Sequence, residues 1–116
     1  MENEWNNYIE ELSRKYGKPT NLIWISKKRK KYVLDFAYAR IVVINDEIYK
    51  FKNIVSCKIE KLQQTETEGP CALLIEVNKN AELIISLTVW SKSTADAVNN
   101  LIQQIIKSNK ICDELL

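Results

Sequence analysis

Near the N-terminus, apolar residues recur at the spacing of one helical face. Charged residues cover the other faces of this segment, with the acidic Glu4, Glu10 and Glu11 before the basic Arg14 and Lys15. Gly17 and the proline that follows it are typical of a helix end. The pattern predicts an amphipathic helix over 3–16, whose apolar face consists of Trp5, Tyr8, Ile9, Leu12 and Tyr16.

The middle of the chain is built from short runs rich in β-forming residues. Polar and apolar positions alternate in several of them; Tyr32, Leu34 and Phe36, for example, fall on one face of their run. Asn and Asp at 45 and 46 indicate a tight turn, because both tolerate positive φ. Since most connections are too short for parallel crossovers, the strands are expected to be antiparallel. The predicted strands cover 22–26, 32–36, 40–44, 47–51, 54–62, 71–78 and 82–90.

A second amphipathic helix is predicted over 93–109, with Ser93 as its N-cap. Trp90, just before it, is expected to fill one end of the core, and the tail 111–116 is expected to fray. Helix, strands and helix in this order are typical of an α+β domain. We therefore divide the chain into an N-terminal helix and linker (1–20), a β-rich domain (21–110) and the tail.

Length and composition fit one small globular domain. The chain has 116 residues, of which 46% are hydrophobic and 28% charged. The longest polar stretch, 63–70, is expected to be a mobile loop. No apolar run reaches the ~20 residues that cross a bilayer, and the acidic N-terminus is unlike a secretory signal. An odd number of cysteines fits a reducing compartment. These features predict a cytoplasmic protein.

The residue types present exclude several chemistries. The chain has no histidine and only two glycines, so histidine-based nucleophilic catalysis, a P-loop and a dinucleotide fingerprint are all excluded. The cysteine spacing does not suit zinc. Cys57 and Cys71 are expected to be buried, with a disulfide as the alternative if their strands are neighbours. We expect that the protein is not an enzyme and binds no cofactor or metal. The remaining catalytic alternative is that two of the strand carboxylates, Asp35, Glu60 and Glu76, face one cavity and act as a catalytic pair.

Five consecutive basic residues form the strongest candidate site, namely Lys27, Lys28, Arg29, Lys30 and Lys31. Without them the chain would carry 12 basic and 15 acidic side chains, so the positive charge is local. Confining cations to one turn concentrates positive potential there. The run is a candidate for binding an anionic membrane surface or a phosphate ligand; the alternative is a solvated turn that keeps a sheet edge soluble.

The stretch from Tyr32 to Glu60 resembles bacterial domains with a pleckstrin-homology-like (PH-like) fold. The resemblance lies in Tyr32-Val33-Leu34-Asp35, then Arg40-Ile41-Val42-Val43, then Ile48-Tyr49-Lys50-Phe51-Lys52-Asn53-Ile54-Val55. It implies a bent antiparallel β-barrel or sandwich of about seven strands, capped by the C-terminal helix and extended here by the N-terminal helix. In PH domains the loop between the first two strands binds anionic headgroups. Leu34 and Phe36 occupy positions where that family's ligand pattern has further cations.

These features predict a non-enzymatic interaction module. Its first expected partner is a protein or peptide, including a second copy of the chain, and its second an anionic membrane surface or phosphate ligand at the basic turn. Nucleic acid is disfavoured because the overall charge is near neutral. The predicted protein interface on the N-terminal helix consists of Trp5, Tyr8, Leu12 and Tyr16. The alternatives are that this helix covers an exposed sheet edge or belongs to the core.

Overall fold

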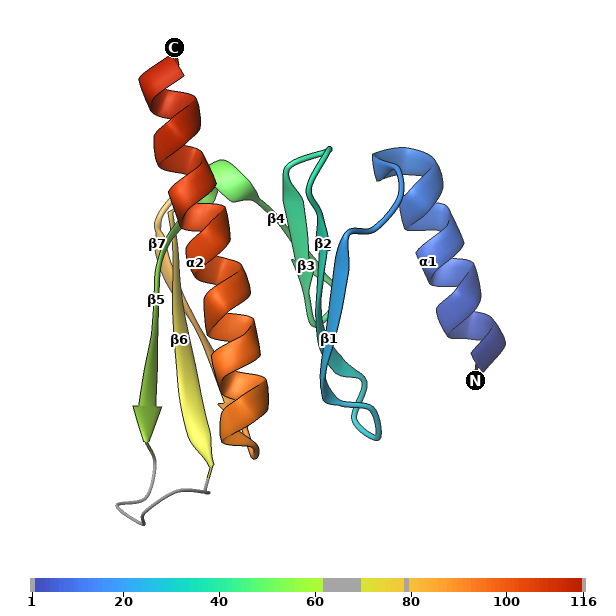
Figure 1. Ribbon diagram of the computed structural model, residues 1–116. Coiled ribbons are helices and arrows are strands. Elements are labelled where there is room, and N and C mark those ends of the chain that lie inside the picture. Colours follow the sequence, from blue (N-terminus) through green and yellow to red (C-terminus); the bar gives the residue numbers. More distant parts are fainter. Residues whose placement is uncertain (1, 62–69, 79, 116) are drawn as a thin grey trace.

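The structure is a computed structural model that describes residues 2–61, 70–78 and 80–115. Figure 1 shows helices on either side of a sheet, and a second sheet beside the longer helix. Helix α1 (Glu2–Tyr16) precedes sheet A, which consists of β1 (Asn21–Ser26), β2 (Lys31–Phe36), β3 (Ile41–Ile44) and β4 (Glu47–Lys50). A 3-10 turn, η1 (Phe51–Asn53), leads to sheet B, which consists of β5 (Ile54–Lys61), β6 (Cys71–Asn78) and β7 (Glu82–Val89). Helix α2 (Lys92–Leu115) ends the chain.

The α+β class and the antiparallel pairing are confirmed. Each predicted strand is present in the described part of the chain, with ends within one residue of those expected. Of the two predicted arrangements of the strands, a barrel or a sandwich, the closed barrel is a wrong prediction. The strand order is β1-β2-β3-β4 in one sheet and β5-β6-β7 in the other, and helix α2 contacts the edge strands β1 and β5 of both. Because α2 and η1 lie between the two sheets, β1 and β5 are covered without pairing to each other, and no barrel closes among the described strands.

Sheet A is buried on both faces, which explains its almost continuous apolar sequence. Val33, Val42 and Ile44 face the interior shared with sheet B and α2. The opposite face packs under α1 and contains Tyr32, Leu34, Phe36, Ile41 and Val43. Helix α1 ends as predicted: Gly17 has a φ of 88°, and its N–H donates to the Ser13 carbonyl at 2.9 Å.

The turn between β3 and β4 has the backbone that its residues predict. Asn45 and Asp46 have φ values of 48° and 73°, as a type I′ hairpin turn requires. The Asn45 side-chain oxygen accepts a hydrogen bond from the Tyr32 N–H at 2.9 Å, and the Asn45 N–H donates to the Tyr32 carbonyl at 3.1 Å. The turn is therefore fixed to the start of β2, next to the basic run.

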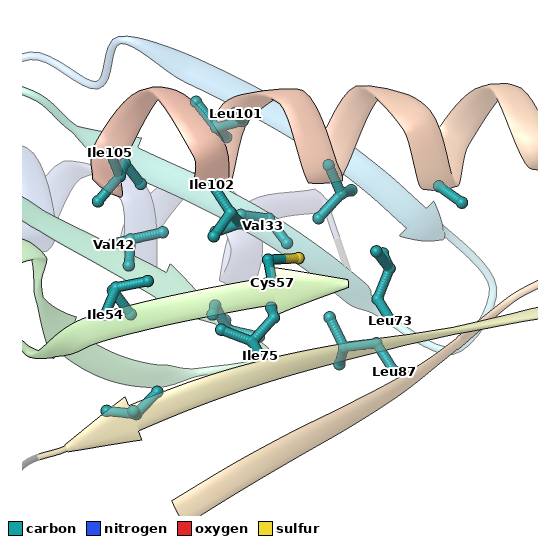
Figure 2. Packing of buried hydrophobic residues seen from close by; sticks show 14 of the residues in the cluster. Val33, Val42, Ile54, Cys57, Leu73, Ile75, Leu87, Leu101, Ile102 and Ile105 are labelled. Atoms are coloured by element: carbon teal, nitrogen blue, oxygen red, sulfur yellow. The ribbon is translucent and has the colours of Figure 1, made fainter. Parts of the chain in front are cut away.

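The main core lies between α2 and the inner faces of the two sheets. Figure 2 shows Leu101, Ile102 and Ile105 of α2 above residues of both sheets. Strict alternation in β5 would place Val55 inside with Cys57. The pairing instead shifts between Ile54 and Ser56, so Ile54 is buried and Val55 is exposed. A bulge of this kind adds one unpaired residue to the strand, so the alternation between buried and exposed side chains shifts by one position.

Three expectations at the C-terminal end of the chain need correction. Ser91, and not Ser93, is the N-cap of α2: its carbonyl accepts from the Ala95 N–H at 3.0 Å and its hydroxyl from the Thr94 N–H at 3.4 Å. Trp90 does not plug the core, because 72% of its surface is exposed. The predicted frayed tail is helical to Leu115. The predicted loop 63–70 lies, apart from Pro70, outside the described residues.

Candidate anion-binding site

The five basic residues occupy the turn between β1 and β2. Lys27 to Lys30 form the turn itself and Lys31 opens β2, and all five side chains are exposed. The Arg29 N–H donates to the Ser26 hydroxyl at 3.3 Å, and the Lys30 N–H to the Lys27 carbonyl at 3.3 Å. Lys30 has a φ of 53°, in the left-handed region. The backbone of this turn is thus tied to β1, while the charged ends face solvent.

The positive charge of this turn is not neutralised by residues that the structure describes. The ion pairs found within 2–61, 70–78 and 80–115 join Arg14 to Glu10, Lys58 to Glu60, and Lys92 to Asp96. None of them involves the basic run. Clustered cations without acidic partners raise the local concentration of anions, so the turn can attract an anion from solution.

A pocket of about 490 Å³ opens beside the basic turn. It brings together the β1–β2 turn, the β3–β4 turn and the end of β7, which are distant in sequence. Of the five predicted cations, Arg29 and Lys31 line it; Lys27, Lys28 and Lys30 do not. Its polar and aromatic wall consists of Ser26, Arg29, Lys31, Asn45, Ser86, Thr88 and Trp90.

The pocket suits an anion because its wall contains two cations and several neutral donors but no carboxylate. Asp46 is next in sequence to Asn45, yet its carboxylate accepts a hydrogen bond from the Tyr32 hydroxyl at 2.5 Å. Burial, followed by this hydrogen bond, raises the pKa of Tyr32 above its ordinary value. The hydroxyl therefore stays protonated and continues to donate this hydrogen bond to Asp46, which does not line the pocket.

The contribution of β7 to this pocket was not predicted from the sequence. The sequence predicted that the Trp90 indole fills one end of the core, whereas Trp90 lies on the same exposed face of β7 as Ser86 and Thr88. Ser86 and Thr88 could have indicated that this face is exposed, because a strand face that carries Ser and Thr is more often exposed than buried. Leu87, which pairs with Leu73, and Val89 are the buried residues of this segment, and the other face of the strand is open to solvent.

The four residues predicted as a protein interface pack against the chain itself. Leu12 is buried, and Trp5, Tyr8 and Tyr16 are half-buried against the outer face of sheet A. The ring of Trp5 lies 4.8 Å from those of both Trp24 and Tyr32, measured between centroids. The helix covers the outer face of sheet A and not a sheet edge, so of the two alternatives the structure agrees with the one in which it belongs to the core. Binding of a partner through these four residues stays a prediction.

The strand carboxylates do not form a catalytic pair in this structure. Asp35 is buried in sheet A, whereas Glu60 and Glu76 belong to sheet B. Glu76 lies opposite Ser56, so Glu60 is four residues further along the strand, roughly 13 Å away. Glu76 accepts a hydrogen bond from the Ser56 hydroxyl at 3.2 Å. No cavity is lined by two of these three residues among those found in the described part of the chain.

Cys57 and Cys71 are both buried, as expected. Their strands are neighbours, but Cys57 pairs with Ile75 and Cys71 with Lys61, so the register holds them too far apart for a disulfide. Burial raises the pKa of the Cys57 thiol to about 11. Within the described ranges, no group of three or more His, Cys, Asp or Glu side chains is placed to hold a metal ion.

Comparison with family models, with curated proteins and with solved structures found no match to this chain. In the part of the chain that the structure describes, neither helix combines the length and the apolar character needed to cross a membrane.

Proposed function

We propose that this protein is an anion-binding module of PH-like architecture that docks on an anionic phospholipid surface. The observation that carries the proposal is the pocket beside the basic turn, where Arg29 and Lys31 meet the exposed indole of Trp90 and no carboxylate. A lipid phosphate fits such a wall because guanidinium and ammonium groups form its strongest hydrogen bonds. Lys27, Lys28 and Lys30 surround the pocket with additional charge.

The strand order supports the PH-like part of this proposal. Seven antiparallel strands in two sheets are followed by a final helix, and the resemblance implies about seven strands and a C-terminal helix. The basic run lies between the first two strands, where PH domains bind headgroups. Leu34 and Phe36, which replace cations of that family's pattern, face α1 and not the pocket. In their place, β7 supplies hydroxyl groups and an indole.

Trp90 gives the proposed site a membrane-facing component as well as a charged one. An exposed indole is suited to the interface between headgroups and acyl chains. Each basic residue near an anionic surface contributes about 1 kcal/mol to binding. Reversing three cations is therefore expected to weaken vesicle binding by at least about 100-fold.

The test is sedimentation of the protein with phosphatidylcholine vesicles that contain or lack phosphatidylserine, at low and moderate salt. We expect binding to the anionic vesicles alone, weakening with salt. The combined substitution Lys28→Glu, Arg29→Glu and Lys30→Glu should abolish it. Trp90→Ala should weaken binding without changing its salt dependence. Failure of the wild-type protein to sediment with anionic vesicles at low salt would refute the proposal.

A matched control separates the site from total charge. Lys50, at the end of β4, and Lys107 and Lys110, in the C-terminal half of α2, are exposed. Figure 1 shows the C-terminal end of α2 and the 3-10 turn after β4 at the opposite end of the molecule from the β1–β2 turn. Triple substitution of these lysines by Glu changes the net charge by the same amount as the reversal in the turn. It should leave most of the vesicle binding intact. Equal losses in the two variants would mean that net charge, and not the pocket, determines binding. Competition by inorganic phosphate would identify the phosphate group as the ligand.

A protein partner, and specifically a second copy of the chain, is the second candidate function. The observation in its favour is the outer edge of sheet B: β7 is an edge strand, and Leu83 and Ile84 in it are 49% and 60% exposed. An edge that exposes neighbouring apolar side chains promotes pairing between strands of two chains. Light scattering during size-exclusion chromatography tests it. A dimer that Leu83→Lys and Ile84→Lys convert to a monomer would support this candidate, and a wild-type monomer at high concentration would contradict it.

A further inference from the structure

Basic residues also gather at the end of sheet A that lies opposite the basic turn. Strand β2 starts at Lys31, in the basic turn, and ends at Phe36, from which the β2–β3 turn leads to Arg40. Strand β4 returns to the same end of the sheet, where Lys50 pairs with Ile41, the residue after Arg40. We call this second group the far basic end. It consists of Lys18, Arg40, Lys50, Lys52, Lys107 and Lys110.

Hydrogen bonds join the segments that carry the far basic end. The Phe51 N–H donates to the Arg40 carbonyl at 2.9 Å, and Asn109 Nδ2 donates to the Phe51 carbonyl at 2.6 Å. Arg40 Nη2 donates in turn to Asn109 Oδ1 at 2.9 Å. The β2–β3 turn, η1 and α2 therefore meet here, together with the lysines that flank these residues in sequence. Figure 1 shows the three segments at one end of the molecule, away from the β1–β2 turn.

The far basic end has a net positive charge. Its lysines are exposed and Arg40 is half-buried. Among the described side chains, none of the six cations takes part in an ion pair. Asp113 and Glu114, in the last turns of α2, reduce this charge without cancelling it. Arg40 lines a small cavity between α2 and sheet A, whereas the lysines lie on the surface, so the far basic end attracts anions as a charged surface and not as a pocket.

An exposed aromatic residue accompanies the cations at each end of the molecule. Tyr38, in the β2–β3 turn, is 93% exposed, and Trp90, beside the basic turn, is 72% exposed. Tyr and Trp are the residues enriched where a membrane meets water, because their rings have an apolar body and a polar tip. Each end thus combines cations with an aromatic side chain suited to a phospholipid surface.

The length of sheet A separates the two ends. The six residues of β2 extend over roughly 17 Å. This is about twice the screening length of ~8 Å at physiological ionic strength. A membrane that neutralises the basic turn therefore leaves the charge of the far basic end in place, and the strands hold that charge away from the membrane.

We infer that the far basic end binds a second anionic phospholipid surface, so that the protein bridges two membranes; this inference rests on the proposed function of the basic turn. Because it lacks a pocket like that of the basic turn, one far basic end binds weakly by itself. Many copies docked on one vesicle present many such ends to the next vesicle, and their combined contacts are much stronger than a single one. An acidic protein would match the charge, but the exposed Tyr38 ring favours a lipid surface.

Dynamic light scattering of phosphatidylcholine vesicles that contain phosphatidylserine tests the inference. At intermediate coverage, the wild-type protein should increase the mean particle diameter several-fold. At saturating protein the diameter should fall again, because no free lipid surface remains for the far basic ends. Wild-type protein that sediments with these vesicles but clusters them at no coverage would overturn this inference and leave the proposed function intact. Absence of sedimentation would overturn both.

Two charge reversals of equal size separate the two ends. The variant with Lys50→Glu, Lys107→Glu and Lys110→Glu should still sediment with anionic vesicles but should not cluster them, since reversing three cations weakens the second contact by at least about 100-fold. The triple reversal in the basic turn should lose both sedimentation and clustering. Tyr38→Ser, a single change in an exposed turn, should reduce clustering without changing sedimentation. Clustering that survives the first variant, or that continues at saturating protein as bridging by a protein dimer would, overturns the inference.

Discussion

Replacing Asp35 by Asn is expected to stabilise the protein at neutral pH. The carboxyl group is buried in β2, and burial raises its pKa above the ordinary value, an effect that the hydrogen bonds from Asn21 only partly oppose. The folded state therefore holds the Asp35 proton more tightly than the unfolded chain does. An amide of the same shape removes the buried charge and retains an oxygen that can accept from Asn21.

The expected gain follows from two opposing contributions. A buried unpaired polar atom costs about 1–3 kcal/mol, and more when the group is charged; within the described residues, Oδ1 of Asp35 is such an atom. The amide NH2 that replaces Oδ1 is also unpaired, so the substitution removes only the part of this cost that comes from the charge. The Asn21 bonds lose about 1 kcal/mol of charge assistance when the carboxylate becomes an amide. The raised pKa means that burial outweighs the hydrogen bonds, so the free energy of unfolding should rise by about 1 kcal/mol. For 116 residues, this corresponds to an increase in Tm of about 4 °C.

The gain should depend on pH with a definite sign. Below the ordinary carboxyl pKa of 3.8, Asp35 is protonated in both states and the wild type should be as stable as Asp35→Asn. As pH rises through the folded-state pKa, the wild type loses this contribution, because ∂ΔG/∂pH is negative where the folded state binds more protons. The variant has no such loss. The two stability curves should therefore diverge with rising pH and then run parallel.

Urea unfolding of both proteins, followed by circular dichroism from acidic to neutral pH, measures this difference. A variant that is less stable at neutral pH, or a difference that shrinks as pH rises, would refute the reasoning about the buried carboxylate. Glu82→Gln serves as the control, since Glu82 is exposed and its replacement should change stability by less than about 0.5 kcal/mol.

Three further substitutions or reactions test the packing. Leu12→Ala should lower the free energy of unfolding, measured with urea, by about 2–3 kcal/mol, since Leu12 lies on the inner face of α1 and is only 7% exposed; no loss would mean that α1 does not pack on sheet A. Ser91→Ala should cost about 1 kcal/mol, while Ser93→Ala should cost much less, because Ser91 is the N-cap of α2; equal losses would contradict this assignment. In the folded Cys112→Ser protein, the Cys57 thiol, with its pKa near 11, should react with a thiol reagent only as the protein unfolds; rapid reaction at neutral pH would show it to be accessible.

The strands and turns could be predicted from sequence because local residue types determine them. The Asn45-Asp46 turn required positive φ at two positions, and both residues tolerate it. The bulge at Val55 had no such signal, since it follows from the pairing of β5 with β6. The Ser91 cap was missed for a related reason. Several polar residues precede the first apolar position of α2, and only the backbone shows which of them is the last residue outside the helix.

The basic turn could be predicted as a candidate site, but its pocket could not. Arg29 and Lys31 are near each other in sequence, whereas Trp90 reaches them only when the end of sheet B approaches the turns of sheet A. A long-range arrangement of this kind has no local pattern. The burial of Asp35 could not be predicted either. The alternation in β2 puts Asp35 on the other face of the strand from Leu34, but that face is buried only because α2 crosses the sheet there.

Helix α1 connects the packing of sheet A to the basic turn. The sheet carries apolar residues on both faces, so without α1 the outer residues Tyr32, Leu34 and Phe36 would be exposed. Tyr32 also holds the β3–β4 turn through hydrogen bonds with Asn45 and Asp46. Because Trp5 of α1 packs on the Tyr32 ring, the helix stabilises the strand start from which Lys31 enters the pocket. We therefore regard α1 as part of the scaffold that positions the anion site, and this makes its inner face the less suitable surface for a partner.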